Sequence, residues 1–200
     1  MVAGFTVQSG FPEDQRSIAA SLFWSAFRGK LEKIMGPEPK ALGFLENVLD
    51  PAYALSAVAT DGTLLGLAGY KTEEGSFAGG SLGDLCTVYG RFGGVWRGLL
   101  LNILERDTEP GLLLMDGIFV SERARGRGIG SALLKAIIQK AADEGLKRVR
   151  LDVIDTNDRA RALYERMGFE AVSKEETGPF KHVFGFAAAT RMETIIPHNN

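Results

Sequence analysis

The residues with the clearest chemical potential form a glycine-rich turn, Arg125-Gly-Arg-Gly-Ile-Gly-Ser131. The turn follows an apolar, strand-like run at residues 112–120 and leads into an apolar-periodic helix. Glycines at alternate positions let backbone N–H groups turn inward without a Cβ in the way. The first turn of the helix adds unpaired N–H groups and the positive end of its dipole. Such a corner is suited to binding a phosphate or a pyrophosphate.

The spacing of these glycines excludes two familiar phosphate-binding motifs. A dinucleotide fingerprint, G-x-G-x-x-G, would need a third glycine where the chain has Ser131. The P-loop string G-x-x-x-x-G-K-[ST] does not occur. The pattern that remains is Arg-x-x-Gly-x-Gly, formed by Arg125, Gly128 and Gly130. Taken alone, it also fits a strand-to-helix turn with solvated arginines.

The composition of the chain limits the classes of function. Its 200 residues suit one compact domain, and its formal net charge of −2 argues against general affinity for nucleic acid. A single cysteine, Cys86, excludes an intramolecular disulfide and fits a reducing compartment. We see no signal peptide and no apolar run near the ~20 residues that span a bilayer, so we expect a cytoplasmic protein without membrane contact. No His, Cys and carboxylate residues stand at metal-ligand spacing, so we expect no metal.

Periodicity and turn signals predict the elements that must position the glycine-rich turn. Asp61-Gly62 marks a hairpin, and Gly145 and Gly168 end helices. Residues 73–111 are less regular, and we interpret them either as a helical insertion that covers a site or as a connection packed on the core. The predicted strands cover residues 5–8, 53–60, 63–71, 112–120, 147–154, 169–173 and 182–187, and the predicted helices residues 13–27, 37–49, 128–144 and 158–167.

Two segments of the second half resemble one protein family. Residues 120–134, Val-Ser-Glu-Arg-Ala-Arg-Gly-Arg-Gly-Ile-Gly-Ser-Ala-Leu-Leu, look like the acetyl-CoA-binding motif of the GCN5-related N-acetyltransferase (GNAT) superfamily. Downstream, Asn157, Ala160, Tyr164 and the Gly168-Phe169 pair resemble the motif that follows it in that family. The match covers residues 112–173 closely, whereas the first hundred residues agree only in the order of elements.

The resemblance implies a fold. It is a mixed α/β (α+β) domain over residues 1–195, with a glycine-rich or helical insertion at about 73–110 and a tail at 196–200. Its central sheet is mostly antiparallel, with about seven strands, and is splayed between its two parallel central strands. Helices cover both faces of this sheet.

The resemblance also implies acetyl-CoA as co-substrate and names the residues that bind it. The backbone of the turn would hold the pyrophosphate, and the strand that ends at Val120 would pair with the pantetheine arm. One N–H of that strand would polarise the thioester carbonyl. The cofactor-binding residues implied in this way are Ile118, Phe119, Val120, Arg125, Gly126, Arg127, Gly128, Ile129, Gly130, Ser131, Asn157 and Tyr164.

Two residues are candidates for proton transfer. The tyrosine at the position of Tyr164 is often the acid that protonates the departing CoA thiolate in this family. Asp116 is our candidate general base. Strand alternation predicts that its side chain shares a side with Ile118 and Val120, and Asp116-Gly-Ile-Phe-Val120 resembles a pattern in aminoglycoside-type members. Asp116 could instead bind the substrate ammonium only or cap a loop. Asp152 and Asp155 are weaker candidates, which we expect to be solvated or turn-forming.

The resemblance implies an N-acetyltransferase that transfers an acetyl group to a primary amine of a small molecule or peptide, by direct attack in a ternary complex. The alternative is a non-catalytic module that binds acyl-CoA as a sensor or regulator. A nucleotide-binding domain of another type is disfavoured by the glycine spacing. The identity of the amine stays open. By analogy with the family, an exposed final strand could pair across a two-fold axis and form a homodimer.

Overall fold

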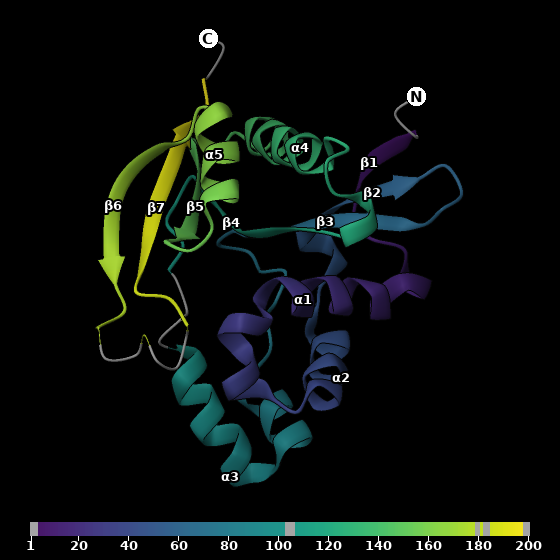
Figure 1. The fold of residues 1–200 in the computed structure, drawn as a ribbon, viewed down its shortest axis with the longest axis vertical. Helices are drawn as coiled ribbons and strands as arrows, with labels where there is room; N and C mark the ends of the chain where they lie inside the picture. Colours follow the sequence, from purple (N-terminus) through teal and green to yellow (C-terminus); the bar gives the residue numbers. More distant parts are fainter. Residues whose placement is uncertain (1–3, 103–106, 179–180, 182–184, 198–200) are drawn as a thin grey trace.

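The structure, a computed structural model, describes residues 4–102, 107–178, 181 and 185–197. Its centre is a seven-stranded sheet in the order β1-β2-β3-β4-β5-β7-β6 (Figure 1). Every neighbouring pair of strands is antiparallel except β4 and β5. The predicted class and the predicted sheet are therefore confirmed. The strands are β1 (Phe5–Ser9), β2 (Ala54–Ala59), β3 (Leu64–Lys71), β4 (Leu112–Val120), β5 (Arg148–Ile154), β6 (Glu170–Glu176) and β7 (Ala188–Ile195).

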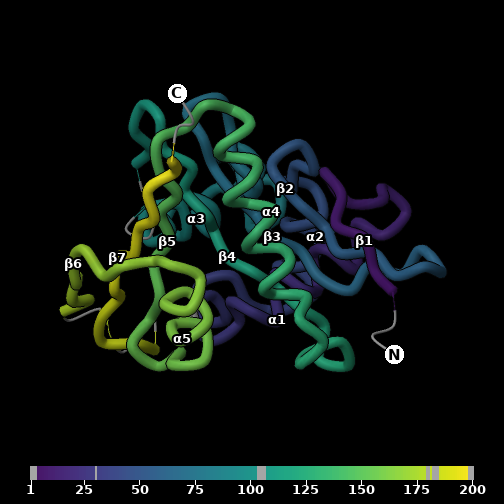
Figure 2. The backbone as a smooth tube through the Cα atoms, turned by 90° about the horizontal axis from the view of Figure 1, so that it is seen from above, coloured from purple at the N-terminus to yellow at the C-terminus, as the bar shows by residue number. Residues whose placement is uncertain are grey.

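The sheet separates two groups of helices (Figures 1 and 2). It also separates two clusters of buried hydrophobic residues. On one face, Trp24 and Leu67 belong to a buried cluster beneath the first three helices. On the other face, Leu133 and Leu151 belong to a cluster beneath the last two. The helices are α1 (Arg16–Met35), α2 (Glu38–Val48), α3 (Leu82–Asn102), α4 (Ile129–Asp143) and α5 (Asp158–Arg166), with short 3-10 turns η1 (Glu13–Gln15), η2 (Pro51–Tyr53) and η3 (Glu122–Ala124).

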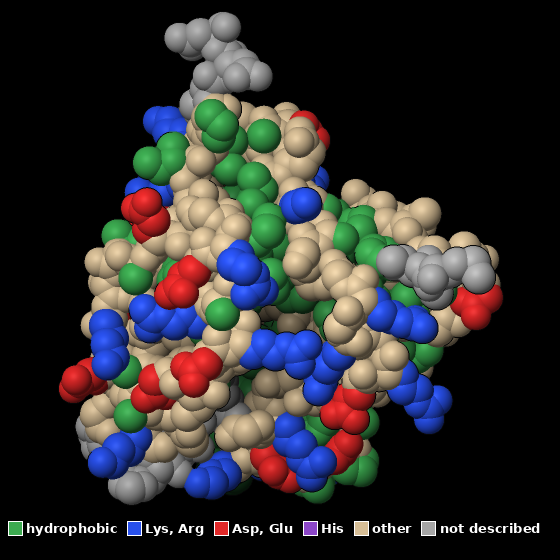
Figure 3. Space-filling model, turned by 45° about the horizontal axis from the view of Figure 1, so that its top comes forward, with side chains coloured by type: hydrophobic (Ala, Val, Ile, Leu, Met, Phe, Trp, Pro, Cys, Tyr) green, Lys and Arg blue, Asp and Glu red, His purple; other side chains and the backbone are tan. Residues whose placement is uncertain are grey.

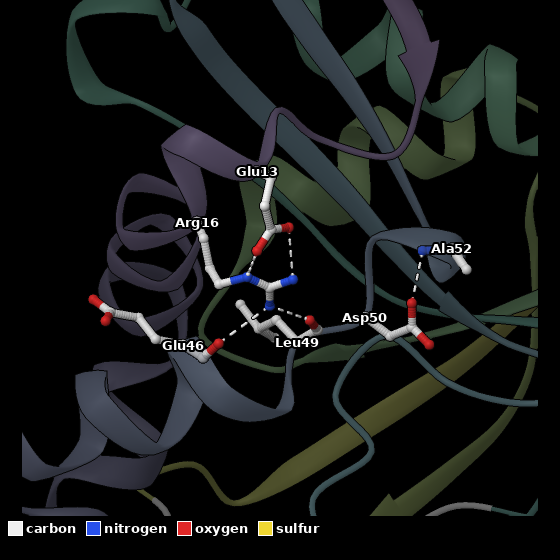
Figure 4. A network of polar contacts seen from close by, with 6 residues as sticks. All are labelled: Glu13, Arg16, Glu46, Leu49, Asp50 and Ala52. Carbon is white, nitrogen blue, oxygen red and sulfur yellow. Dashed lines mark hydrogen bonds and ion pairs between the residues drawn. The ribbon is translucent and has the colours of Figure 1, made fainter.

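One arginine ties the start of α1 to the end of α2 (Figure 4). Nη1 of Arg16 donates to the backbone oxygens of Glu46, at 3.1 Å, and Leu49, at 2.6 Å. The Glu13 carboxylate accepts from Nε and Nη2 of the same guanidinium. The last carbonyls of a helix have no partner within it, so Arg16 satisfies two groups that would otherwise need water. The contact fixes how the two helices diverge below the sheet.

The two parallel strands pair over a short stretch only. Leu112, Leu113 and Leu114 of β4 stand in register with residues 148–150 of β5. Beyond that point β4 continues to Val120 and β5 to Ile154, but the two strands no longer pair with each other. The splay predicted between the two central strands is therefore confirmed, and it opens the sheet near its middle.

Several predicted boundaries change. The first helix continues to Met35 instead of ending at residue 27. The strand predicted at residues 182–187 is wrong, because β7 begins only at Ala188 and residues 185–187 precede it, while 182–184 lie outside the described residues. Ile196, which we assigned to the tail, is buried, and its N–H donates to the backbone oxygen of Lys147 at 2.9 Å. The ordered domain thus includes Ile196.

The last strand is not an edge of the sheet. β7 lies between β5 and β6, so the exposed final strand on which we based a homodimer does not exist. The edge strand on this side of the sheet is β6, which is exposed at every residue. It carries Lys174, Glu175 and Glu176, and charges on an edge strand oppose pairing with another chain. The fold therefore gives no support to a homodimer through this edge.

Two features are absent from the described residues. None of the helices there is both long and apolar enough to cross a bilayer. Within the same part of the chain, no three or more His, Cys, Asp and Glu side chains are grouped so that they could hold a metal ion.

Candidate active site

The glycine-rich corner has the backbone geometry expected of an anion site. Gly126 and Gly128 have φ angles of +79° and +81°, a region that costs other residues about 1–2 kcal/mol. A Cβ at either position would meet no atom within 4 Å. Glycine is therefore favoured here by the backbone conformation and not by a lack of space. Gly128 is the N-cap of α4, and its carbonyl accepts the N–H of Ala132 at 3.0 Å. The N–H groups of residues 129–131 thus precede the first helical bond and lie at the positive end of the dipole.

The side chains around this corner divide between solvent and core. Arg125 and Arg127 are exposed, and basic side chains gather around a recess on the face that carries α4 and α5 (Figure 3). The Arg125 guanidinium lies 3.5 Å from the Glu122 carboxylate and donates to the backbone oxygen of Val120 at 3.4 Å. Ile129 is buried, so only its backbone can contact a ligand. The corner therefore offers backbone donors with exposed positive charge beside them.

The strand that leads to the corner presents its backbone to the splay. Ile118 and Val120 pack on the α4 side of the sheet. Phe119 points the opposite way, and its ring centroid lies 5.3 Å from that of Phe23 and 5.4 Å from that of Phe27. One edge of this part of β4 pairs with β3, and the register with β5 ends at Leu114. The role predicted for residues 118–120 is a backbone role, and this arrangement is compatible with it.

The two downstream residues implied by the resemblance differ in their surroundings. Asn157 is exposed and caps α5, because its Oδ1 accepts the N–H of Ala160 at 3.2 Å. Its amide nitrogen is the group that remains suited to a ligand. Tyr164 is buried in α5, and this burial raises the pKa of its phenol to about 12. The neighbouring Leu163 lies against the corner, since a Cβ on Gly130 would be 3.5 Å from its Cδ2.

Asp116 does not lie where strand alternation predicts. Gly69 and Tyr70 of β3 are opposite Gly117 and Met115 of β4, so Asp116 is an extra residue in a β-bulge. The bulge reverses the alternation, and Asp116 lines a cavity on the α1–α3 face, away from Ile118 on the α4 face. The prediction that these residues share a side is therefore wrong.

The cavity that Asp116 faces has a volume of about 740 Å³. Its walls come from α1, α2 and α3, and its floor from β3, β4 and β5. Residues from the segment 73–111, including Ser76, Leu85 and Leu99, form part of its lining. The segment thus lines the cavity and also packs on the core, because Phe77 and Leu85 belong to the buried cluster on this face.

Asp152 is a second acidic residue of the cavity, although we ranked it below Asp116 from the sequence. We expected it to be solvated or turn-forming, but its side chain is 7% exposed and lines the cavity. Its carboxylate lies 3.6 Å from the guanidinium of Arg150, which is buried as well. Alternation along β5 contained the signal, because Val149, Leu151 and Val153 face the α4 side and leave Asp152 on the other. Asp155 instead follows the last residue of β5, and its Oδ2 accepts the N–H of Ala188 at 3.2 Å.

Comparison with known families agrees with this geometry. The family model described as Acetyltransferase (GNAT) family matches residues 18–169, which is more than half of the chain. The chain therefore belongs to the GNAT acetyltransferase family.

Individual relatives match shorter parts. The chain is 37% identical over 67 residues to the spermine/spermidine N(1)-acetyltransferase of Bacillus subtilis, covering 33% of this chain and 44% of that protein. It is 36% identical over 64 residues to the thialysine N-epsilon-acetyltransferase of Bos taurus, covering 32% of this chain and 38% of that protein. The chain thus spans less than half the length of these curated relatives. A solved GCN5-related N-acetyltransferase from Kribbella flavida has the same fold, with a TM-score of 0.62, 18% identity and coverage of 96% of this chain and 97% of that one.

Proposed function

We propose that this protein is an acetyl-CoA-dependent N-acetyltransferase that acts on a primary amine through a ternary complex. The observation that carries the proposal is the arrangement around the splay. The phosphate-type corner lies at the start of α4 on one face of the sheet, the backbone of residues 118–120 borders the splay, and a cavity with two carboxylates lies on the opposite face. A donor and an acceptor held on the two sides of one opening gain much of their rate from proximity.

The residues of the corner fit the pyrophosphate of the donor. The unpaired N–H groups of residues 129–131 would bind its oxygens, with Arg125 and Arg127 adding charge. The β4 edge beyond Leu114 would pair with the amide-bearing arm of the donor, and one of its N–H groups would polarise the thioester carbonyl.

Two residues of this chain would move protons. In this proposal Asp116, directly or through water, accepts a proton from the attacking amine, whose nitrogen forms the new C–N bond as the C–S bond breaks. Tyr164 protonates the departing thiolate. Its pKa of about 12 keeps the phenol protonated at neutral pH, as an acid must be. A thiolate is already a fair leaving group, since free thiols have a pKa of about 8.5, so Tyr164 assists the step without being essential.

The donor half of the proposal is tested by calorimetric titration with acetyl-CoA. Ser131→Glu places a negative charge in the first turn of α4, where it favours the helix but repels a pyrophosphate. We expect the Kd for acetyl-CoA to rise roughly tenfold or more, about 1.4 kcal/mol, without loss of thermal stability. Gln139→Glu adds the same charge to an exposed position later in α4 and should leave Kd within about twofold. Equal affinity in both variants would refute the assignment.

The acceptor half is tested by turnover with a panel of amines. Asp116→Asn keeps the size of the side chain and removes its basicity. We expect kcat to fall by about 10²-fold or more with acetyl-CoA affinity unchanged, whereas Asp155→Asn, the control at the end of β5, should retain activity. Acetyl-CoA binding without transfer to any amine by the native protein would favour the alternative, a non-catalytic acyl-CoA-binding module.

A further inference from the structure

The cavity beside Asp116 has a polar end and an apolar end. The polar end is the sheet, where Asp116 of β4 and Asp152 of β5 both line the cavity. Among the described lining residues these two carboxylates are the only acidic groups and Lys71 of β3 is the only basic one, so the net formal charge of this end is −1. An ammonium group would therefore be held against the sheet, at the splay where β4 and β5 separate.

The walls that lead away from the sheet are formed by side chains without charge. Phe27 and Leu31 come from α1, Phe44 from α2, and Leu85 from α3, and no charged residue of these three helices is among the described lining residues. A second ammonium group at this depth would lose its hydration and meet no carboxylate among them, which is costly. The hydrophobic part of a ligand would instead gain by leaving water.

The rim of the cavity supports the same conclusion. Val95 and Leu99 of α3 line it and are 46% and 68% exposed. Large apolar side chains on the rim of a concave site indicate a surface that a ligand covers. A volume of about 740 Å³ is also far more than the reacting amine itself needs. The cavity thus has room for an apolar body attached to the amine.

From these observations we infer that the acceptor is a primary amine with a single positive charge on a bulky apolar body, an aryl-alkyl or alkyl chain, and not a polyamine. The inference rests on the proposed function and narrows it. The named substrate of the Bacillus subtilis relative, a polyamine, is not carried over, because that match covers only 33% of this chain. In the bound state the ammonium faces Asp116 and the apolar body lies between α1, α2 and α3.

The test compares hexylamine with cadaverine, which has the same number of heavy atoms but ends in a second ammonium group. Phenethylamine and shorter alkylamines complete the panel, and CoA release from acetyl-CoA is measured. We expect kcat/KM for hexylamine to exceed that for cadaverine by at least tenfold, and to rise roughly fourfold for each added methylene. A kcat/KM for cadaverine equal to or above that for hexylamine would overturn the inference while leaving the proposed function intact.

A matched pair of variants tests whether the cavity causes the preference for hexylamine over cadaverine. Leu99→Glu adds a carboxylate to the apolar rim at an exposed position, and we expect it to lower kcat/KM for hexylamine and raise it for cadaverine. Phe92→Glu makes the same kind of change on α3 at a residue that is 95% exposed and outside the lining, and it should change neither. Identical behaviour of the two variants would contradict the assignment.

The same amines also separate this inference from the proposed function. If no amine is acetylated, the proposed function fails, and calorimetric titration of hexylamine and cadaverine in the presence of CoA then decides the inference. Tighter binding of hexylamine, weakened in Leu99→Glu only, supports it. Equal binding, tighter binding of cadaverine or no binding of either overturns it.

Discussion

Tyr164 shows how the surroundings of one residue determine what it can do. Its phenol is buried in α5 beside Phe169, with ring centroids 6.1 Å apart, and desolvation disfavours the phenolate. The pKa of about 12 means that the group holds its proton throughout the pH range in which enzymes are assayed. It is therefore suited to donate a proton and unsuited to accept one. Among the two proposed proton-transfer residues, this leaves Asp116 as the base.

Replacing Tyr164 by Phe should slow acetyl transfer by about tenfold, at the lower end of the range for general acids, because the thiolate leaves readily without help. The acidic limb of the pH–rate profile should be unchanged, since the phenol is protonated on both sides of it. Steady-state kinetics between pH 6 and about 9.5 measures both quantities. A pH–rate profile whose acidic limb moves in Tyr164→Phe would contradict the role of an acid with so high a pKa.

The same residue predicts how stability depends on pH. The folded-state pKa of Tyr164 is raised above the ordinary value of 10.0, so its contribution is fully present below pH 10 and is lost as the pH rises towards about 12. Denaturant unfolding at pH 9 and 11.5 should show a larger loss of stability for the native protein than for Tyr164→Phe. The difference is expected to be on the order of 2 kcal/mol. Equal losses would mean that the phenol is not desolvated.

At the scale of elements, α3 shapes the cavity through an interruption in its own backbone. Gly90 has φ 74° and ψ 166°, so the helix is kinked between its first turns and the part that carries Val95 and Leu99. That region of backbone space is essentially restricted to glycine. A Cβ on Gly90 would meet no atom within 4 Å, so any cost of a larger residue comes from the backbone alone. The kink thus sets the direction of the cavity wall.

Gly90→Ala should therefore destabilise the protein by about 1–3 kcal/mol and raise KM for the amine, with the Kd for acetyl-CoA unchanged. Gly29→Ala is the control, because Gly29 is exposed within α1, and a Cβ there also meets nothing within 4 Å. That substitution should stabilise the protein by up to about 1 kcal/mol. Thermal unfolding and steady-state kinetics measure both effects, and a Gly90→Ala variant with native stability and KM would show that the kink is dispensable.

At the scale of the whole molecule, the splay divides the sheet into two parts that share little backbone pairing. β1 to β4 form one part and β5 to β7 the other, joined by the short register between residues 112–114 and 148–150. The buried cluster on the α4 side spans both, since it contains Leu113 of β4 and Leu151 of β5. A ligand bound in the splay would add contacts to both parts and would favour the folded state.

Acetyl-CoA should consequently raise the unfolding temperature. At a concentration of 100 times Kd the folded state gains about 2.7 kcal/mol, which for a domain of this size corresponds to roughly 5–10 °C. Differential scanning calorimetry with and without acetyl-CoA measures the shift. Ser131→Glu should show a much smaller shift at the same ligand concentration, and a native protein without any shift would contradict binding in the splay.

The features that the sequence determined by itself are local. The glycine-rich corner, the helix that follows it and the alternation of β5 depend on residues a few positions apart, so their patterns are visible along the chain. The downstream pattern of Asn157 and Tyr164 added the resemblance to the family, and with it the mostly antiparallel sheet with two parallel central strands. Boundaries were less reliable where strand pairing with distant segments decides them, as for β7.

The tertiary structure alone decided where the proposed acceptor cavity and its two carboxylates lie. Whether Asp116 points to one face or the other depends on a bulge, and the bulge is set by pairing with β3, a strand more than forty residues earlier. The burial of Asp152 beside Arg150 is likewise a property of the folded sheet, in which both side chains are covered. The cavity exists only because three helices diverge beneath the splay. The face to which a strand residue points depends on the register of its strand, because a shift by one residue reverses every side chain that follows. Register is set by pairing between strands and cannot be read from the sequence of one strand.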